Sequence, residues 1–405
     1  MIITLQDNLI LPCGVKLPNR LAKAAMSEQL SDYHNRPTTE LVRLYQRWAD
    51  GGIGLNITGN VMVDRKALGE PCNVVVEDER DLDKLSEWAK AGKSRGGKFI
   101  MQINHPGRQS PTFVSSEPVA PSAIAVNVGV GMFAKPRALT EKEILEIIER
   151  FGQTAKVAVK AGFDGVQIHS AHGYLSNQFL SPLTNLRTDN WGGSPENRRR
   201  FLLEVVRSAR RAMGKKAILS VKLNSADFQK GGFSQEESMA VVQELEKEQI
   251  DLLEISGGTY EASAMIGDGQ KESTKKREAY FLEYAEKVRK QVKIPLMLTG
   301  GFRTAEAMKS ALADGTVDLI GLARPLAVEP DLPSRILASN ANARPATRHR
   351  VGIKMFDGFV ELIWHTQQLH RMGAGKDPDP NRSAWLTLLS GLLHDGISSF
   401  RLKRG

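Results

Sequence analysis

A short run of apolar and β-branched residues, then a turn and a helical segment, recurs eight times along the chain. Each run is nearly continuous in apolar residues over its first half, which is typical of parallel strands covered on both faces. The runs lie at residues 20–27, 53–63, 98–105, 162–171, 217–227, 250–260, 294–302 and 317–326. The pattern predicts a series of strand–helix units.

Segments with helical spacing lie between these runs. Three of them start with recognisable N-cap residues, Thr140, Ser194 and Ser234. The first and third have glutamate three residues later, which completes a capping box, and the second is followed by proline. The expected helices cover residues 39–48, 82–93, 141–160, 195–213, 234–248, 277–291, 305–313 and 332–338.

Eight strand–helix units predict an α/β fold, a (β/α)8 TIM barrel. A doubly wound sheet is the competing architecture, but no GxGxxG motif follows the first run, which argues against its dinucleotide-binding version. We expect the first 18 residues to form a hairpin under the barrel. The long insertion 106–139 belongs on the active-site face, because loops of that length on a barrel are commonly functional.

The chain is expected to have two parts, a TIM-barrel domain at residues 1–343 and a partly helical, basic extension at residues 344–405. The extension contains the helical stretch FDGFVELIWHTQQLHRM and the apolar stretch WLTLLSGLL. Packing on the barrel is the expected role, with a subunit interface or contact with lipid as alternatives.

Composition narrows the function classes. The formal charge is +9, and residues 344–405 carry ten Lys/Arg against five Asp/Glu, so the extension holds +5 of it. A solvated basic tail is favoured over nucleic-acid binding. The chain has no run of 18 apolar residues and no basic, apolar leader, so we expect neither a membrane span nor secretion. Its two cysteines, Cys13 and Cys72, suit a reducing cytoplasm.

In a (β/α)8 barrel the active site is built from the carboxyl ends of the strands. At the end of the seventh run, Gly300 and Gly301 precede a helix, and backbone N–H groups there favour an anion. Arg303 and Arg324 add charge-assisted hydrogen bonds. The arrangement predicts a phosphate site; a tight turn with surface arginines is the alternative.

The fourth run ends in HSAHGY, which contains His169, His172 and Tyr174. Zinc chemistry usually needs three protein ligands, and a hydrolytic dyad needs a placed nucleophile, for which no GxSxG is present. Two imidazoles without a metal suit hydrogen-bond donation to a substrate oxygen, and Tyr174 suits proton donation. A buried capping histidine and a packed tyrosine are the structural alternative. Lys222 inside a strand needs a partly negative partner, such as a reduced flavin.

The stretch GFDGVQIHSAHGYLSNQFLSPLTNLRTDNWGGSPENRRRF (162–201) resembles the hallmark of the Old Yellow Enzyme family, FMN-dependent NAD(P)H oxidoreductases and ene-reductases. NRLAKAAMS, MQINHPGRQ and LTGGFRT agree with the same family in the same order, and the resemblance spans roughly residues 5–340. It implies an enzyme that reduces electron-poor substrates, such as α,β-unsaturated carbonyl compounds, in a two-step hydride-transfer cycle. An NADH oxidase or demethylase with another acceptor is the alternative within the same fold.

The resemblance also implies residue roles. His169 and His172 would bind the activating oxygen of the substrate, and Tyr174 would deliver the proton. Ser27 stands where the family has threonine or cysteine near flavin O4 and N5, and Lys222 stands where many members have arginine near N1 and O2. The other cofactor residues would be Ala25, Met26, Asn60 and Gln102 around the ring, and Gly300, Gly301, Arg303, Ala323 and Arg324 at the phosphate.

This chain departs from the family at several positions. Gly59 and Asn60 replace the glutamate or alanine that many members carry there, and the serine at position 27 leaves the flavin potential open. The longer branch of the family needs a cysteine cluster after the barrel, and no cysteine follows Cys72, so the short form with FMN alone is implied. The expected partner is a small-molecule substrate, with a homo-oligomer left open. A tRNA-modifying barrel and a non-catalytic scaffold are the remaining alternatives.

Overall fold

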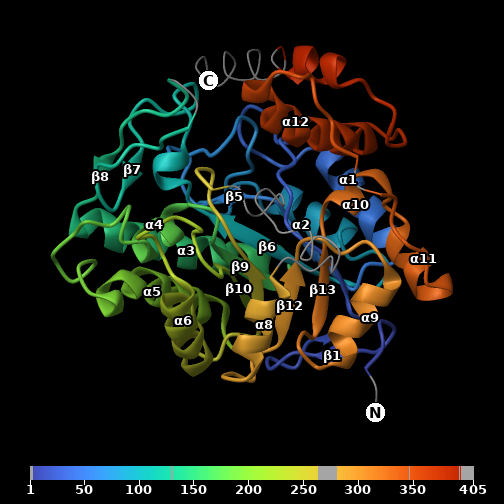
Figure 1. The fold of residues 1–405 in the computed structure, drawn as a ribbon, viewed down its shortest axis with the longest axis horizontal. Coiled ribbons are helices and arrows are strands. Elements are labelled where there is room, and N and C mark those ends of the chain that lie inside the picture. Colours follow the sequence, from blue (N-terminus) through green and yellow to red (C-terminus); the bar gives the residue numbers. More distant parts are fainter. Residues whose placement is uncertain (1–2, 129–130, 263–280, 346, 392, 394–405) are drawn as a thin grey trace.

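The computed structural model describes residues 3–128, 131–262, 281–345, 347–391 and 393. Its centre is a ring of parallel strands (Figure 1). The strands are β3 (Leu21–Lys23), β4 (Leu55–Ile57), β6 (Lys98–Asn104), β9 (Gly165–Ser170), β10 (Ile218–Asn224), β11 (Leu252–Ser256), β12 (Leu296–Thr299) and β13 (Leu319–Leu322). Because β4 pairs with β3 on one side and with β6 on the other, the ring is closed. The predicted (β/α)8 barrel is confirmed, and each strand lies within its predicted run. A short strand, β5 (Val61–Met62), pairs with the end of β6.

Alternate residues of each strand face the barrel interior, and these positions change character along the strand. The inward positions of β10 are Ile218, Ser220, Lys222 and Asn224, whereas the residues between them pack in the core under the helices. Ile218 belongs to an apolar cluster with the first inward residues of neighbouring strands. The barrel is therefore apolar at its amino end and polar at its carboxyl end, where a site can form.

The predicted hairpin closes the apolar end. It consists of β1 (Leu9–Ile10) and β2 (Lys16–Leu17), which pair antiparallel. Leu9, Leu11 and Leu17 pack in the same cluster as Ile218 and Leu252. Water is thereby excluded from this end, and the opposite end is left for chemistry.

The predicted helices form around the ring. They are α1 (Thr39–Asp50), α2 (Leu82–Ala91), α3 (Glu141–Lys160), α5 (Pro195–Met213), α6 (Gln235–Lys247), α8 (Leu282–Arg289), α9 (Ala305–Ala313) and α11 (Leu332–Ser339). The three N-caps, Thr140, Ser194 and Ser234, each accept a backbone hydrogen bond as expected. Residues 277–280 of the expected helix 277–291 lie outside the described residues. Two short helices were not predicted, α4 (Leu175–Leu180) and α10 (Arg324–Val328).

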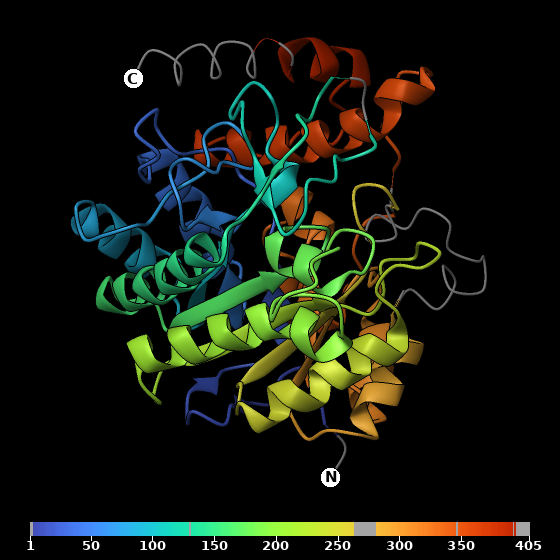
Figure 2. The same ribbon diagram turned by 90° about the vertical axis from the view of Figure 1, so that its left-hand side faces the viewer.

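The insertion and the extension both lie at the carboxyl ends of the strands. The insertion forms a 3-10 turn, η1 (Gly107–Gln109), and a strand pair, β7 (Val119–Ala120) and β8 (Arg137–Ala138). The extension forms α12 (Lys354–Gly373) and a helical stretch at 384–391. In both views α12 and the hairpin lie on opposite sides of the molecule (Figures 1 and 2).

The extension packs on the barrel, as expected. His370 hydrogen-bonds the carbonyl of Glu28 at 2.8 Å, and Arg43 of α1 donates to the carbonyl of Gly373 at 2.6 Å. None of the helices in the described part of the chain is both long enough and apolar enough to cross a membrane.

Candidate active site

The turn after β9 brings together the three residues predicted to carry the chemistry. The His169 and His172 rings lie 5.1 Å apart, and the His169 and Tyr174 rings lie 4.8 Å apart, both edge to face. His172 adopts φ 61° and Gly173 φ 81°, so the chain reverses sharply between the rings. A Cβ on Gly173 would lie 2.4 Å from Gln109 Oε1, which explains the glycine.

His169 is buried and His172 is half-buried, and both are uncharged at neutral pH. Burial lowers the pKa of His169 well below its usual value, and electrostatic repulsion from the His172 and Lys222 sites lowers it further. Burial and Lys222 have the same effect on the pKa of His172. His172 Nε2 lies 2.7 Å from Ser256 Oγ, and its backbone N–H donates to Asn224 Oδ1 at 3.2 Å. Neutral imidazoles held in this way can donate N–H groups to a substrate oxygen.

Tyr174 belongs to a cluster of neutral hydrogen-bonding groups. Its hydroxyl lies 2.8 Å from the hydroxyl of Tyr260, and Asn60 Nδ2 donates to it at 3.2 Å. Burial raises the pKa of the Tyr174 phenol, and the nearby Glu70 carboxylate raises it further. The phenol is therefore protonated throughout the physiological pH range, which a proton donor requires.

A chain of side chains crosses the barrel interior below the histidines. Gln102 Nε2 donates to Gln167 Oε1 at 2.7 Å, and Gln167 Nε2 donates to Glu254 Oε2 at 2.9 Å. Glu254 Oε1 lies 2.9 Å from Lys222 Nζ, across the β10–β11 register. The negative partner that a buried Lys222 was expected to need is thus supplied, in this structure, by the fully buried carboxylate of Glu254.

The residues after β3 lie at the same end of the barrel. Ala25 and Met26 are half-buried and pack against the two hydrophobic cores. Ser27 Oγ donates a hydrogen bond to a carboxylate oxygen of Glu70. In this structure the Ser27 hydroxyl therefore donates its hydrogen bond to another residue of the protein, Glu70.

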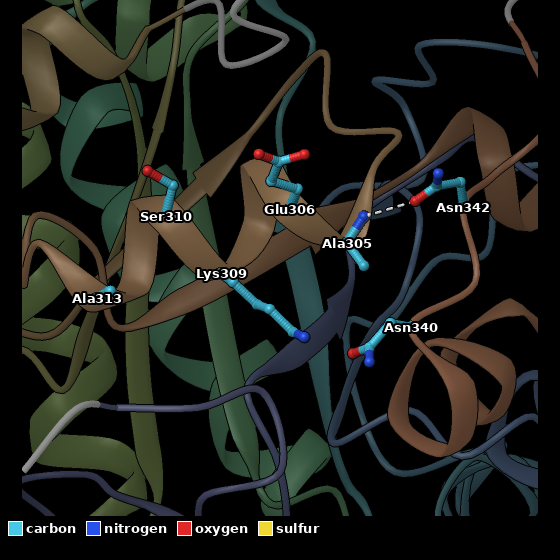
Figure 3. Close-up of a pocket in the computed structure, with 7 residues that line it drawn as sticks. All are labelled: Ala305, Glu306, Lys309, Ser310, Ala313, Asn340 and Asn342. Carbon is cyan, nitrogen blue, oxygen red and sulfur yellow. Dashed lines mark hydrogen bonds between the residues drawn. The ribbon is translucent and has the colours of Figure 1, made fainter.

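The predicted phosphate site lies where β12 leads into α9, and the N-terminus of α9 is not open to a ligand as the sequence had indicated. Gly300 and Gly301 have φ 125° and 95°, a conformation that favours glycine. The first turn of α9, however, is capped by protein: Thr304 accepts from Ala307 N, and Asn342 Oδ1 accepts from Ala305 N at 2.9 Å (Figure 3). The groove beside it, lined by Glu306, Lys309 and Asn340, lies along α9 (Figure 3).

Arg303 and Arg324 are the two arginines predicted to bind the phosphate. Both contact the part of the chain that follows α11. Arg303 Nη1 donates to the carbonyl of Arg344 at 2.8 Å, and Arg324 Nη1 lies 3.7 Å from Glu361 Oε1 of α12. Ala323 and Arg324 open α10, which has no side-chain cap. The groups here that could bind an anion are the glycine backbone, the start of α10 and the two guanidinium groups, because the N-terminus of α9 is already capped by protein.

An ion pair and hydrogen bonds hold the insertion next to the candidate site. Arg108, which is 5% exposed, forms an ion pair with Glu261 and donates to the carbonyl of Ala125 at 2.8 Å. Gln109 Nε2 donates to the carbonyl of His172 at 3.1 Å. The Phe133 ring lies 6.4 Å from the Tyr260 ring. The predicted position of the insertion on the active-site face is confirmed for its described residues, 106–128 and 131–139.

Three polar residues of the site were missed from the sequence: Glu70, Glu254 and Tyr260. Glu254 interrupts the apolar run of a buried strand, which is itself a signal for a buried ion pair. Tyr260 follows that strand in SGGTY, at the same barrel end as HSAHGY. Glu70 lies in a loop after β5 and carries no comparable signal.

The residues present fit a polar, anionic cofactor such as FMN. Lys222, Arg303 and Arg324 supply positive charge around the mouth of the barrel. Thr299 Oγ1, at the end of β12, is buried without a hydrogen-bond partner among the described residues. Orphaned polar atoms of this kind are rare in proteins and suit a bound group.

Comparison with known proteins gives a consistent result. A family described as NADH:flavin oxidoreductase / NADH oxidase matches residues 12–342. The chain is 38% identical over 355 residues to the NADH-dependent flavin oxidoreductase iliE of Hypocrea jecorina, with 81% of this chain and 88% of that protein covered. It is 33% identical over 327 residues to the NADH oxidase of Thermoanaerobacter brockii, with 80% of this chain and 49% of that protein covered.

Solved structures show the same similarity. The Old Yellow Enzyme homologue from Zymomonas mobilis superposes with a TM-score of 0.72 at 27% identity, over 85% of this chain and 95% of that one. Morphinone reductase superposes with a TM-score of 0.72 at 28% identity, over 85% of this chain and 92% of that one.

Proposed function

The chain belongs to the NADH:flavin oxidoreductase / NADH oxidase family, and from that premise we propose that its acceptor is an electron-poor alkene, such as an α,β-unsaturated carbonyl compound. It is an FMN-dependent oxidoreductase that takes its electrons from NADH or NADPH. The observation that carries the proposal is the cluster of His169, His172 and Tyr174 within ring contact of one another at one strand end.

The cofactor would lie across the carboxyl ends of the strands. Ser27, Gln102 and Lys222 would contact the flavin ring, which Ala25, Met26 and Asn60 would line. The phosphate would be held by Gly300, Gly301, Arg303, Ala323 and Arg324. When bound, FMN supplies a hydride that NAD(P)H restores.

The two histidines hold the oxygen of the acceptor. Both are neutral, so each can donate an N–H group to the same carbonyl oxygen. Negative charge develops on that oxygen when the β-carbon is reduced, and donors fixed in a dry site stabilise it without reorganising. Lys222 lies opposite His169 in the β9–β10 register, so it adds a positive charge close to the two rings.

Tyr174 delivers the proton. Its phenol is 5% exposed and protonated, and it lies against His169, beside the oxygen-binding position. Proton transfer from its hydroxyl to the α-carbon of the acceptor completes the reduction. A positioned general acid typically contributes about 100-fold or more to the rate.

Replacing Tyr174 with phenylalanine tests this assignment. Rapid mixing under anaerobic conditions separates flavin reduction by NADH from flavin reoxidation by cyclohexenone. We expect Tyr174→Phe to slow only reoxidation by the alkene, by about 100-fold. Tyr284→Phe is the matched control, because the Tyr284 hydroxyl donates to Ser238 at 2.7 Å in a buried position outside the site. An equal loss in both half-reactions would refute the assignment.

The similarity to an NADH oxidase supports one alternative, in which oxygen or another compound is the natural acceptor. The same enzyme would then reoxidise quickly in air and slowly with alkenes. Demethylation is the other chemistry that this fold would support with the same cofactor.

We also propose a domain organisation, a cellular location and an oligomeric state. Residues 1–343 would form the catalytic domain, and residues 344–405 would be an extension outside that domain. The location would be cytoplasmic. A homo-oligomer is supported by Trp385, Leu386 and Leu389, whose side chains are largely exposed on the extension.

A further inference from the structure

We propose that Tyr260 is a second proton-transfer residue, which donates its hydroxyl hydrogen bond to Tyr174 and returns a proton to it in each cycle. The proposal rests on the proposed function, because it concerns how the proton donor of that reaction is oriented and restored.

The direction of the hydrogen bond follows from the proposed role of Tyr174 as proton donor, and the contacts of Tyr174 are compatible with it. A phenol group has one hydrogen to donate, and its oxygen can accept hydrogen bonds. Asn60 Nδ2 takes one acceptor position at 3.2 Å, and the orientation of its amide agrees with Asn104 Nδ2, which lies 3.4 Å from Asn60 Oδ1. If Tyr260 donates across the 2.8 Å contact, both acceptor positions are filled and the hydrogen of Tyr174 is left for the substrate. The opposite direction would engage the one hydrogen that Tyr174 has to give.

The difference in exposure between the two tyrosines indicates that Tyr260 is the one that exchanges a proton with water. Tyr174 is 5% exposed, so it has little access to water, whereas Tyr260 is only partly buried. When the O–H bond of Tyr174 breaks and the C–H bond at the α-carbon forms, a phenolate is left on Tyr174. The Tyr260 proton then moves across to that phenolate, and water protonates Tyr260.

The energetics agree with a shared proton. Burial raises the pKa of both phenols, so an isolated phenolate is costly at either position. A hydrogen bond to a charged oxygen is stronger than one between neutral groups. Two donors on Tyr174, Asn60 and Tyr260, therefore stabilise its phenolate and make it a stronger acid.

The insertion holds Tyr260 in place. The next residue, Glu261, forms an ion pair with the buried Arg108, and its other oxygen accepts from Asn127 N at 2.9 Å. The Phe133 ring lies 6.4 Å from the Tyr260 ring. Arg108 is thus a positioning residue that links the insertion to the proton relay.

The test is a double-mutant cycle on the holoenzyme, with Tyr260→Phe, Tyr174→Phe and both together, and with Tyr284→Phe as the control. We expect Tyr260→Phe to leave flavin reduction by NADH unchanged and to slow reoxidation by cyclohexenone on the order of 10-fold, the loss of one hydrogen bond to a charged group. In the Tyr174→Phe background the second substitution should cause no further loss.

A spectroscopic readout separates the relay from simple packing. The chain has six tyrosines, so the ring-carbon signals of tyrosine labelled with carbon-13 at Cζ can be assigned by substitution. Tyr260→Phe should move the Tyr174 signal, and Tyr284→Phe should not. An unchanged reoxidation rate in Tyr260→Phe, or an equal loss in both backgrounds, would overturn the relay while leaving the proposed function intact. A wild-type enzyme that accepts electrons from NADH but reduces no alkene would overturn both.

Discussion

The Lys222–Glu254 pair offers a quantitative test of the interior of the barrel. The two charged atoms lie 2.9 Å apart, and the two side chains are 5% and 0% exposed. At an effective dielectric constant of about 20, the Coulomb attraction at that distance is about 6 kcal/mol. Much of it offsets the loss of hydration, and removing one partner of a buried pair typically costs about 3–5 kcal/mol.

We therefore expect Glu254→Gln and Lys222→Met each to lower the free energy of unfolding of the FMN-free protein by about 3 kcal/mol or more. The double variant should lose less than the sum of the two, with a coupling energy of at least about 2 kcal/mol. Urea denaturation followed by tryptophan fluorescence measures all four proteins.

Lys23 provides the matched control for this cycle. It is also a buried lysine, but it donates to neutral groups, Tyr45 OH at 2.9 Å and the Ile57 carbonyl at 2.6 Å. Lys23→Met combined with Glu254→Gln should show a much smaller coupling energy. Losses from Lys222→Met and Glu254→Gln that simply add would refute the view that these two charges balance each other.

The remaining predictions concern acid stability and cofactor retention. Burial lowers the pKa of His105 and His365 to about 4 and the pKa of His169 and His172 well below the usual value. The unfolded chain therefore binds more protons than the native state below about pH 6.5, and each such histidine lowers the free energy of unfolding by about 1.4 kcal/mol per pH unit as the pH falls from there toward its native pKa. Urea denaturation at pH 7, 6 and 5 checks this, and a free energy that does not change with pH would contradict it. Arg324→Ala should weaken FMN binding about 10-fold or more, the value of one charge-assisted hydrogen bond. Arg335 lies on α11 and pairs with Glu329, so Arg335→Ala should leave FMN binding unchanged. Recovery of flavin fluorescence on dilution measures both, and equal affinities would exclude Arg324 from the phosphate site.

Much of the fold was predictable because its signals are local. Continuous apolar runs marked the eight strands, and the helices that start at Thr140, Ser194 and Ser234 were placed correctly because those side chains cap them. The helices α4 and α10 were missed, because six and five residues are too few to show helical periodicity.

The site was harder to predict because its contacts depend on how the strands are aligned around the barrel. HSAHGY was identified as a candidate by its residue types and its place at a strand end. The contact between Lys222 and Glu254 follows from the β10–β11 register, which no local pattern reveals. The pairing of Arg324 with Glu361 joins the barrel to the extension and requires the tertiary structure.

The central claim is tested most directly by the visible absorption of the purified protein during one anaerobic cycle. The account predicts an oxidised-flavin spectrum that bleaches when NADH is added and returns when cyclohexenone is added without oxygen. A colourless protein that takes up no FMN would contradict it. So would a bleached flavin that stays bleached with the alkene and recovers only in air.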